Sequence, residues 1–394
     1  MPVVPLSLDG IPTELKWEVL TQVPDLLSLR SLVHASPSYH QAYYQKPESI
    51  LFTVLSRDIE PVLCDAFMAN QCSKLRCEGM DRSGRIQAKK EFIEHYKQNH
   101  DQPMKLPEKL ELQGTVELAY LHIIIHDLVD DFCRSTFEVY TLSYGRDIEY
   151  VPPSPTEKRR IFRAFYRFQI YCNLFSMSGV RSPDTKEFTI PDIQEDFDGA
   201  DKPWMFFSIF QPWEVEELGC IRDFIYKRYT EKFQEVEADV AMMNESDDDG
   251  ISVWSSEHFN FSSDGINVKD YKEHFMELGL PFLHQVLTTS YEKRKVLIAD
   301  NLWPNHFFIS EPLTEPPYHS LNVTEIYEAH ENKGDILFDG DQQGPNQAWV
   351  WYVGGKVTPY YYDYSGEVPR CWGYVIWDKS RLENWHAEDA VPKD

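Results

Sequence analysis

Residues 6–44 of this 394-residue chain, LSLDGIPTELKWEVLTQVPDLLSLRSLVHASPSYHQAYY, decide its fold. Three short helices are predicted here, separated by breaks at Pro24-Asp25 and Ser36-Pro37. Pro12 marks the first helix start, because its fixed φ suits a first helical turn and its missing N–H is not needed there. Apolar residues recur at helical spacing along the first two helices, namely Leu15, Val19, Leu20, Val23, Leu26, Leu29, Leu32 and Val33.

These helices carry more apolar surface than they can cover by themselves. A segment of about forty residues forms only a marginal core. Part of the apolar surface must therefore meet either another part of the chain or another protein.

The same residues resemble an F-box. That family opens with Leu-Pro, then an acidic residue, an aliphatic residue and, one turn later, an aliphatic pair. The corresponding residues are Ile11-Pro12, Glu14-Leu15 and Val19-Leu20, with Ile11 in place of the usual Leu. The later Leu-rich helix, Leu-Val pair, Ser and aromatic residue of the family match Leu26, Leu29, Leu32, Val33, Ser36 and Tyr39, although Tyr39 stands where the family often has Trp.

The resemblance covers about forty residues. The segment looks most like the F-box of proteins from filamentous fungi, and this resemblance implies a function. In that family the motif docks onto a Skp-type adaptor and so onto a cullin-RING ubiquitin ligase. We therefore expect a non-catalytic adaptor that recruits an unknown protein substrate. The residues expected to bind the Skp-type protein are Ile11, Pro12, Leu15, Val19, Leu20, Leu26 and Leu29. The alternative is an N-terminal helical hairpin that packs wholly within its own chain.

Composition narrows the classes of partner and the compartment. The formal charge of −26 argues against binding to nucleic acid or to an anionic membrane. No run of about eighteen apolar residues and no secretory leader is found, so no membrane partner is expected. Seven cysteines, an odd number spread over a long chain, suit a reducing compartment. The sequence thus predicts a cytoplasmic or nuclear protein.

Beyond the first module, a mainly α fold is expected. We divide the chain into an F-box-like module at 1–58, a helical body at 59–300 with an acidic loop near 244–250, and an aromatic C-terminal portion at 301–394. Helices are predicted at 84–99, 115–140, 156–176 and 268–291, and one or two helices are predicted at 206–243. The C-terminal portion is predicted to be β-rich, with a hairpin at Gly354-Gly355 flanked by AWVWYV and followed by GYVIW. The closing CWGYVIWDKSRLENW also resembles the end of many fungal F-box-type proteins.

Three groups of residues have metal-ligand chemistry, and each has an ordinary structural interpretation that we favour. The set Cys72, Cys77, His95 and His100 has an inner spacing of seventeen residues, too long for a zinc finger, so a core thiol and solvated histidines are expected. His122, His126 and Asp130 share one helix face, where a hydrogen-bonded core histidine is the commoner outcome. The third set, Asp339, Asp341, Gln343 and Gly344, begins like an EF-hand loop but lacks the final Glu, so a turn is expected.

The remaining candidates concern anions and small molecules. The basic patch Lys158, Arg159, Arg160, Arg163 and Arg167 could bind phosphate, but a solvated helix face that pairs with acidic groups is favoured. No hydrolase elbow, P-loop or dinucleotide fingerprint is present, so no catalytic residue, metal or cofactor is expected. The alternative function is a small-molecule-binding protein or enzyme, with a stacking pocket formed by Trp349, Trp351, Tyr360, Tyr361, Tyr362 and Trp372.

Overall fold

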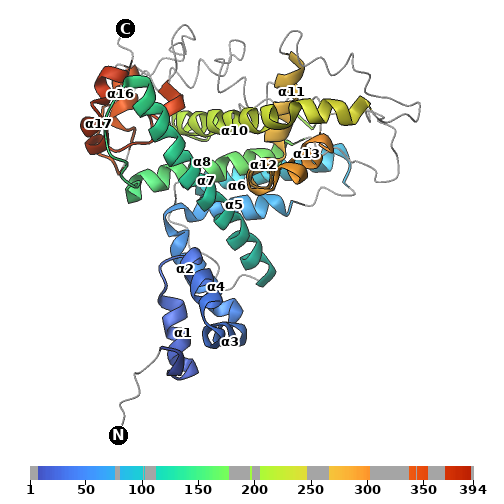
Figure 1. Ribbon diagram of the computed structural model, residues 1–394, viewed down its shortest axis with the longest axis vertical. Helices are drawn as coiled ribbons and strands as arrows, with labels where there is room; N and C mark the ends of the chain where they lie inside the picture. Colours follow the sequence, from blue (N-terminus) through green and yellow to red (C-terminus); the bar gives the residue numbers. More distant parts are fainter. Residues whose placement is uncertain are drawn as a thin grey trace.

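The structure is a computed structural model, and it describes residues 8–75, 80–100, 102, 112–176, 196–197, 205–245, 266–301, 337–342, 344–353 and 369–391. The mainly helical fold predicted from the sequence is confirmed: within these ranges the regular elements are all helices, and no β-strand occurs. A short unit formed by the first helices projects from a wider body (Figure 1).

The projecting part, here called the N-terminal unit, comprises residues 8–58. It contains the 3₁₀ helix η1 (Leu8–Gly10) and the helices α1 (Thr13–Gln22), α2 (Leu26–Ala35), α3 (Pro37–Gln45) and α4 (Pro47–Asp58). The predicted breaks act as helix starts: the Asp25 carboxylate accepts from the Ser28 N–H at 2.6 Å, and the Ser36 hydroxyl accepts from the Tyr39 N–H at 3.4 Å. The Trp17 indole N–H donates to the Ala42 carbonyl at 2.9 Å and ties α1 to α3.

The rest of the described chain forms the body. It comprises η2 (Glu60–Val62), α5 (Leu63–Ser73), α6 (Arg82–Asn99), α7 (Leu112–Tyr144), α8 (Pro155–Phe175), α10 (Pro212–Glu245), α11 (Ile266–Glu277), α12 (Gly279–Thr288) and α13 (Tyr291–Ala299). The C-terminal elements are α16 (Gln347–Val353), η3 (Pro369–Trp372), α17 (Lys379–Trp385) and η4 (Ala387–Ala390). Helix α8 lies at the centre and packs against α5, α7, α10 and α12 (Figure 1). One apolar core runs from the N-terminal unit through the body.

Three arginines of α8, Arg160, Arg163 and Arg167, pair with acidic groups as predicted, but they do so largely inside the protein, so the solvated face expected for them is wrong. Arg160 and Arg167 are buried, and Arg167 contacts Asp65 of α5 at 3.1 Å and Glu214 of α10 at 3.2 Å. Arg163 binds Glu214 at 3.0 Å and forms a two-pronged contact with Glu217 at 2.5 and 2.7 Å. The neighbouring helices supply carboxylates, and pairing offsets the desolvation of each guanidinium.

The predicted β-rich C-terminal portion is also wrong in the described residues. The segment AWVWYV lies in the helix α16, and GYVIW forms turns after η3, whereas the hairpin predicted at Gly354-Gly355 lies outside the described residues. Buried Asn346 explains the difference. Its side-chain oxygen accepts from the Trp349 N–H at 2.9 Å and caps α16, while its amide donates to the carbonyls of Tyr374 and Trp377 at 2.7 and 3.0 Å. This capping and the surrounding burial override the strand preference of the aromatic residues.

The acid stability of the body should depend on Glu214. Burial opposes ionisation of this carboxyl, but Arg167 and Arg163 outweigh burial and lower its pKa from 4.5 to about 2. Because the folded pKa is depressed, the stabilisation is complete above pH 4.5 and is lost as pH falls towards 2, with a magnitude of roughly 3 kcal/mol. We expect Glu214→Gln to lower the free energy of unfolding at pH 7 and to reduce its decline between pH 5 and 2. Denaturant unfolding at several pH values measures the free energy of unfolding, and Glu138→Gln, at an exposed glutamate, is the control. If the free energy of unfolding of Glu214→Gln falls between pH 5 and 2 as steeply as that of the parent protein, the assignment to Glu214 is wrong.

Candidate partner-binding surface

Helix α1 exposes two aliphatic side chains that a helix serving only to cover a core would not need. Leu20 is 0% exposed and Lys16, one turn earlier, is only 8% exposed, so these two residues define the inward face. On the outward face, Leu15 is 52% and Val19 is 36% exposed. A lysine therefore occupies the buried face of α1 while two aliphatic side chains face solvent.

The buried lysine is accommodated by its neighbours. The Lys16 ammonium lies 6.0 Å from the centre of the Tyr39 ring, and its charge also favours the ionised form of Asp9. A long lysine stem can cover apolar surface while its charged end remains close to polar groups. The inward face of α1 can thus be closed without Leu15 or Val19, which leaves these two side chains uncovered.

The structure divides the seven predicted docking residues into two sets. Ile11 is half-buried and Pro12 is exposed at the start of α1, on the chain leading to Leu15 and Val19. We call Ile11, Pro12, Leu15 and Val19 the α1 stripe. The other three, Leu20, Leu26 and Leu29, are buried in the core, so they support the unit from within.

Helix α1 is held at its C-terminal end by a residue that sequence reasoning did not identify. The Arg57 guanidinium of α4 donates to the carbonyls of Thr21 and Val23, the latter at 3.0 Å. A cation at the C-terminal end of a helix satisfies orphan carbonyls and complements the helix dipole. The sequence contains no signal for this contact, because the two segments are more than thirty residues apart.

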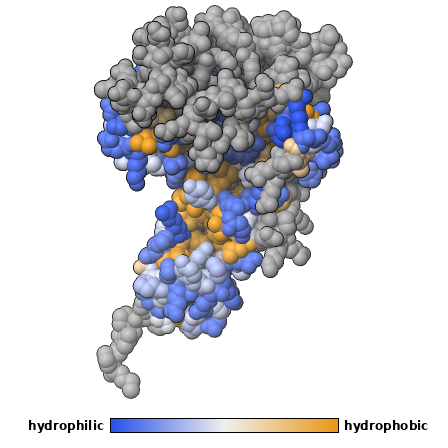
Figure 2. Space-filling model, turned by 90° about the vertical axis from the view of Figure 1, so that its right-hand side faces the viewer, coloured by the Kyte–Doolittle hydropathy of each residue, from blue (hydrophilic) through white to orange (hydrophobic). Residues whose placement is uncertain are grey.

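A second apolar area lies at the waist between the N-terminal unit and the body. Figure 2 shows apolar surface there, above the largely polar face that the N-terminal unit presents in this view. Among the helices of this region, α7 packs against α4 and exposes Leu112 and Val116 in its first turns. Exposed apolar residues therefore occur both on α1 and on the body helix that supports the unit.

The three groups with metal-ligand chemistry behave as ordinary structural residues where they are described. Cys72 is a buried thiol and His95 is exposed, while Cys77 lies outside the described residues. His122 is buried and bonds the Tyr166 hydroxyl at 2.7 Å, as the core interpretation predicted. Asp341 lies in a turn and accepts from the Lys379 N–H at 3.0 Å. Within the described residues no cluster of three or more potential metal ligands occurs.

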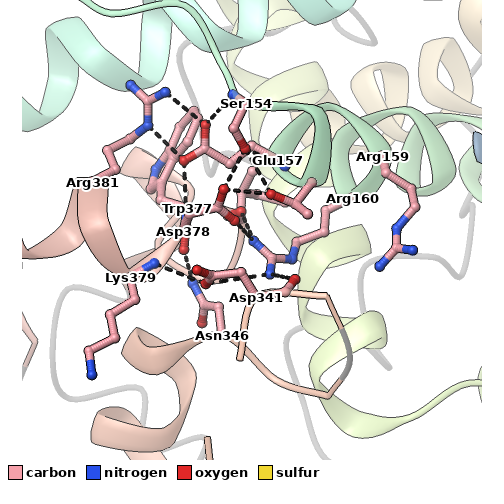
Figure 3. Close-up of polar contacts among 12 residues, drawn as sticks. Ser154, Glu157, Arg159, Arg160, Asp341, Asn346, Trp377, Asp378, Lys379 and Arg381 are labelled. Atoms are coloured by element: carbon pink, nitrogen blue, oxygen red, sulfur yellow. Dashed lines mark hydrogen bonds and ion pairs between the residues drawn. The ribbon is translucent and has the colours of Figure 1, made fainter. Parts of the chain in front are cut away.

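The densest polar network joins the start of α8 to the C-terminal segment (Figure 3). Asp378 contacts the hydroxyls of Ser154 and Thr156, the latter at 2.5 Å, and Arg160 at 2.9 Å. Glu157 binds Arg381 at 2.7 Å and accepts from the Asp378 N–H at 2.9 Å. The donors and acceptors satisfy one another, and the network contains no histidine or cysteine, so we interpret it as a clasp that holds the C-terminal segment on α8.

The aromatic residues proposed for a ligand pocket are largely part of the core where they are described. Trp372 is buried against Tyr140 and Tyr374, and Trp349 is buried against Trp213. Trp351 is half-buried, and residues 360–362 lie outside the described residues. Trp349 and Trp372 thus contribute to packing.

Comparison with known proteins assigns no family: no protein-family model, curated protein or solved structure matches this chain. Within the described residues, no helix combines the length and apolar character needed to cross a bilayer.

Mutations on the two faces of α1 should differ in how much they change the free energy of unfolding. Leu20→Ala removes a fully buried side chain and should lower the free energy of unfolding by about 2–5 kcal/mol. Leu15→Ser and Val19→Ser alter exposed side chains and should change it by less than about 0.5 kcal/mol. Chemical denaturation of the purified proteins measures both, and a large loss of stability in Leu15→Ser would show that this side chain is packed.

The clasp should be important for stability. Asp378→Ala removes the nearer of the two carboxylates that pair with buried Arg160, at 2.9 Å, and leaves only Asp341 at 3.9 Å, so we expect a loss of about 3–5 kcal/mol in the free energy of unfolding. The matched control is Asp389→Ala, since Asp389 also pairs with an arginine, Arg146, but is largely exposed, so only a small change is expected. Equal effects of the two substitutions would contradict the assignment of the clasp.

Proposed function

We propose that this protein is a non-catalytic adaptor whose N-terminal unit docks onto a Skp-type protein of a cullin-RING ubiquitin ligase. In this proposal the body recruits a protein substrate, and the protein works in the cytoplasm or the nucleus. The contribution to ubiquitin transfer is proximity, because holding a substrate beside a charged conjugating enzyme raises its effective concentration.

The observation that carries the proposal is the outward apolar stripe of α1. Leu15 and Val19 face solvent although Lys16, on the same helix, is buried. Leu20 shares the inward face with this lysine, so the pattern is only partly amphipathic. A helix that only had to close its own core would gain from an aliphatic residue in place of Lys16 and polar ones in place of Leu15 and Val19. The α1 stripe coincides with residues that the resemblance to F-box proteins implies for adaptor docking, namely Ile11, Pro12, Leu15 and Val19.

The position of α1 also supports the proposal. The N-terminal unit projects from the body, so a partner can approach α1 without meeting the long helices α7, α8 and α10 (Figure 1). The buried residues Leu20, Leu26 and Leu29 stabilise the unit and contribute to docking only by keeping α1 in place. The α1 stripe itself would form the apolar centre of the interface, where truncation of an anchor typically weakens binding by about 2 kcal/mol or more.

Adaptor binding tests this function directly. Leu15→Asp combined with Val19→Asp introduces two charges into the α1 stripe and should reduce co-purification with a Skp-type protein by at least roughly thirtyfold. The milder pair Pro12→Ala with Leu15→Ala should also cause loss of co-purification while helical content stays unchanged.

The matched control is Val116→Asp, which places a charge on another exposed valine, on α7. It should leave co-purification intact. Retention of the adaptor by the α1 double variant, with folding verified by circular dichroism, would refute the proposed function.

A further inference from the structure

We propose that Asp58 is a positioning residue that sets the angle at which the N-terminal unit, and with it the α1 stripe, projects from the body. Asp58 is the last residue of α4, at the boundary between the two parts. It would act through His122 of α7, and its role would be separate from that of the α1 stripe, which makes the proposed contact with a partner.

One carboxylate oxygen of Asp58 reaches both sides of the boundary. Asp58 Oδ2 accepts from the Leu26 N–H in the first turn of α2 at 3.0 Å, and the same oxygen lies 3.4 Å from His122 Nε2. On its other side, His122 Nδ1 lies 2.7 Å from the Tyr166 hydroxyl of α8. A single chain of polar contacts thus runs from α2 through α4 and α7 to α8.

The His122 ring is fixed on the side of the body. His122 is 2% exposed and stacks on Phe162, with ring centres 5.2 Å apart. Its ring is also parallel to that of Tyr166 within 10°. The His122 ring is therefore fixed to the body by packing. Because Asp58 belongs to the N-terminal unit, its contact with His122 restricts where that unit lies relative to the body.

The adjacent residue completes the arrangement. Arg57 binds the carbonyls at the end of α1, whereas Asp58 binds an N–H at the start of α2. Each charge has the sign that favours the helix end it meets. Through these two consecutive residues, α4 holds both sides of the turn between α1 and α2, so a rotation of α4 relative to α7 would move α1 with it.

The remaining packing at the boundary is apolar and gives less directional control. Helices α2 and α4 both pack against α7, within an apolar core shared by the two parts. Apolar burial is non-directional, whereas the contact between Asp58 Oδ2 and His122 Nε2 brings two particular polar atoms together across the boundary. Burial opposes ionisation of the Asp58 carboxyl, but its contacts with His122 and the Leu26 N–H outweigh burial and lower its pKa.

A distance measurement tests the inference in the full-length protein. Spin labels are placed at two exposed positions, Glu18 on α1 and Gln234 on α10, through non-cysteine chemistry because Cys371 is exposed. Double electron–electron resonance then gives the distribution of distances between the N-terminal unit and the body. We expect a narrow distribution for the parent protein and a broadened or shifted one for Asp58→Ala.

The matched control is Asp25→Ala. Asp25 also accepts from an N–H in the first turn of α2, that of Ser28, but in the described contacts it bonds within its own unit. Both substitutions remove a hydrogen bond at the same helix end, so similar decreases in melting temperature are expected, and only Asp58→Ala should broaden the distribution. His122→Gln tests the contact from the side of the body and should also broaden the distance distribution. If Asp58→Ala fails to fold, the result for His122→Gln tests the positioning role in its place.

These outcomes distinguish the positioning role of Asp58 from the proposed adaptor function. Only the consequence of that role for docking rests on the proposed function. Unchanged distributions in both Asp58→Ala and His122→Gln, or equal broadening in Asp25→Ala, would overturn the positioning role even if the adaptor binds. Broadening confined to the Asp58 and His122 variants supports the role whether or not an adaptor binds, since the measurement requires no partner.

Discussion

Helix α1 divides its side chains between core and solvent, and the proposed docking surface depends on this division. Lys16 and Leu20 share the inward face, and Leu15 and Val19 share the outward one. A helix of ten residues has room for only one buried face in so small a unit. Because Leu20 already supplies that face together with the leucines of α2, the outward aliphatic pair contributes little to the stability of the isolated chain. This division makes α1 a candidate for binding a partner.

A second feature of the molecule is that several of its arginines form ion pairs in the interior. The chain carries 38 basic and 64 acidic residues, so carboxylates are in excess. Several arginines nevertheless lie inside, each against one or more carboxylates: Arg160 with Asp378, Arg163 with Glu217, Arg167 with Asp65, and Arg370 with Glu216. The first three pairs connect α8 to the C-terminal segment, to α10 and to α5, and the fourth connects η3 to α10. These arginines thus hold the body together.

Local periodicity predicted the elements well, and it failed where distant residues decide the structure. The helices at 115–140 and 156–176 were evident from their apolar spacing, and Pro24-Asp25 and Ser36-Pro37 marked the breaks in the N-terminal unit. The helix α16 was missed because its start is fixed by buried Asn346, whose other partners lie about thirty residues later in the chain. The apolar character of Leu15 and Val19 is evident from the sequence. The spacing of Leu15, Val19 and Leu20 does not by itself show that only Leu20 is buried. The bridge from Asp58 to His122 joins residues that no local pattern connects.

Hydrogen–deuterium exchange with and without a purified Skp-type protein tests the central claim most directly, because it reports which backbone segments a partner covers. The account predicts a stable complex in which exchange slows across residues 11–22 and remains unchanged in the central turns of α8. Absence of a complex, or protection confined to the body while α1 exchanges as before, would contradict the claim that the outward face of α1 is a docking surface.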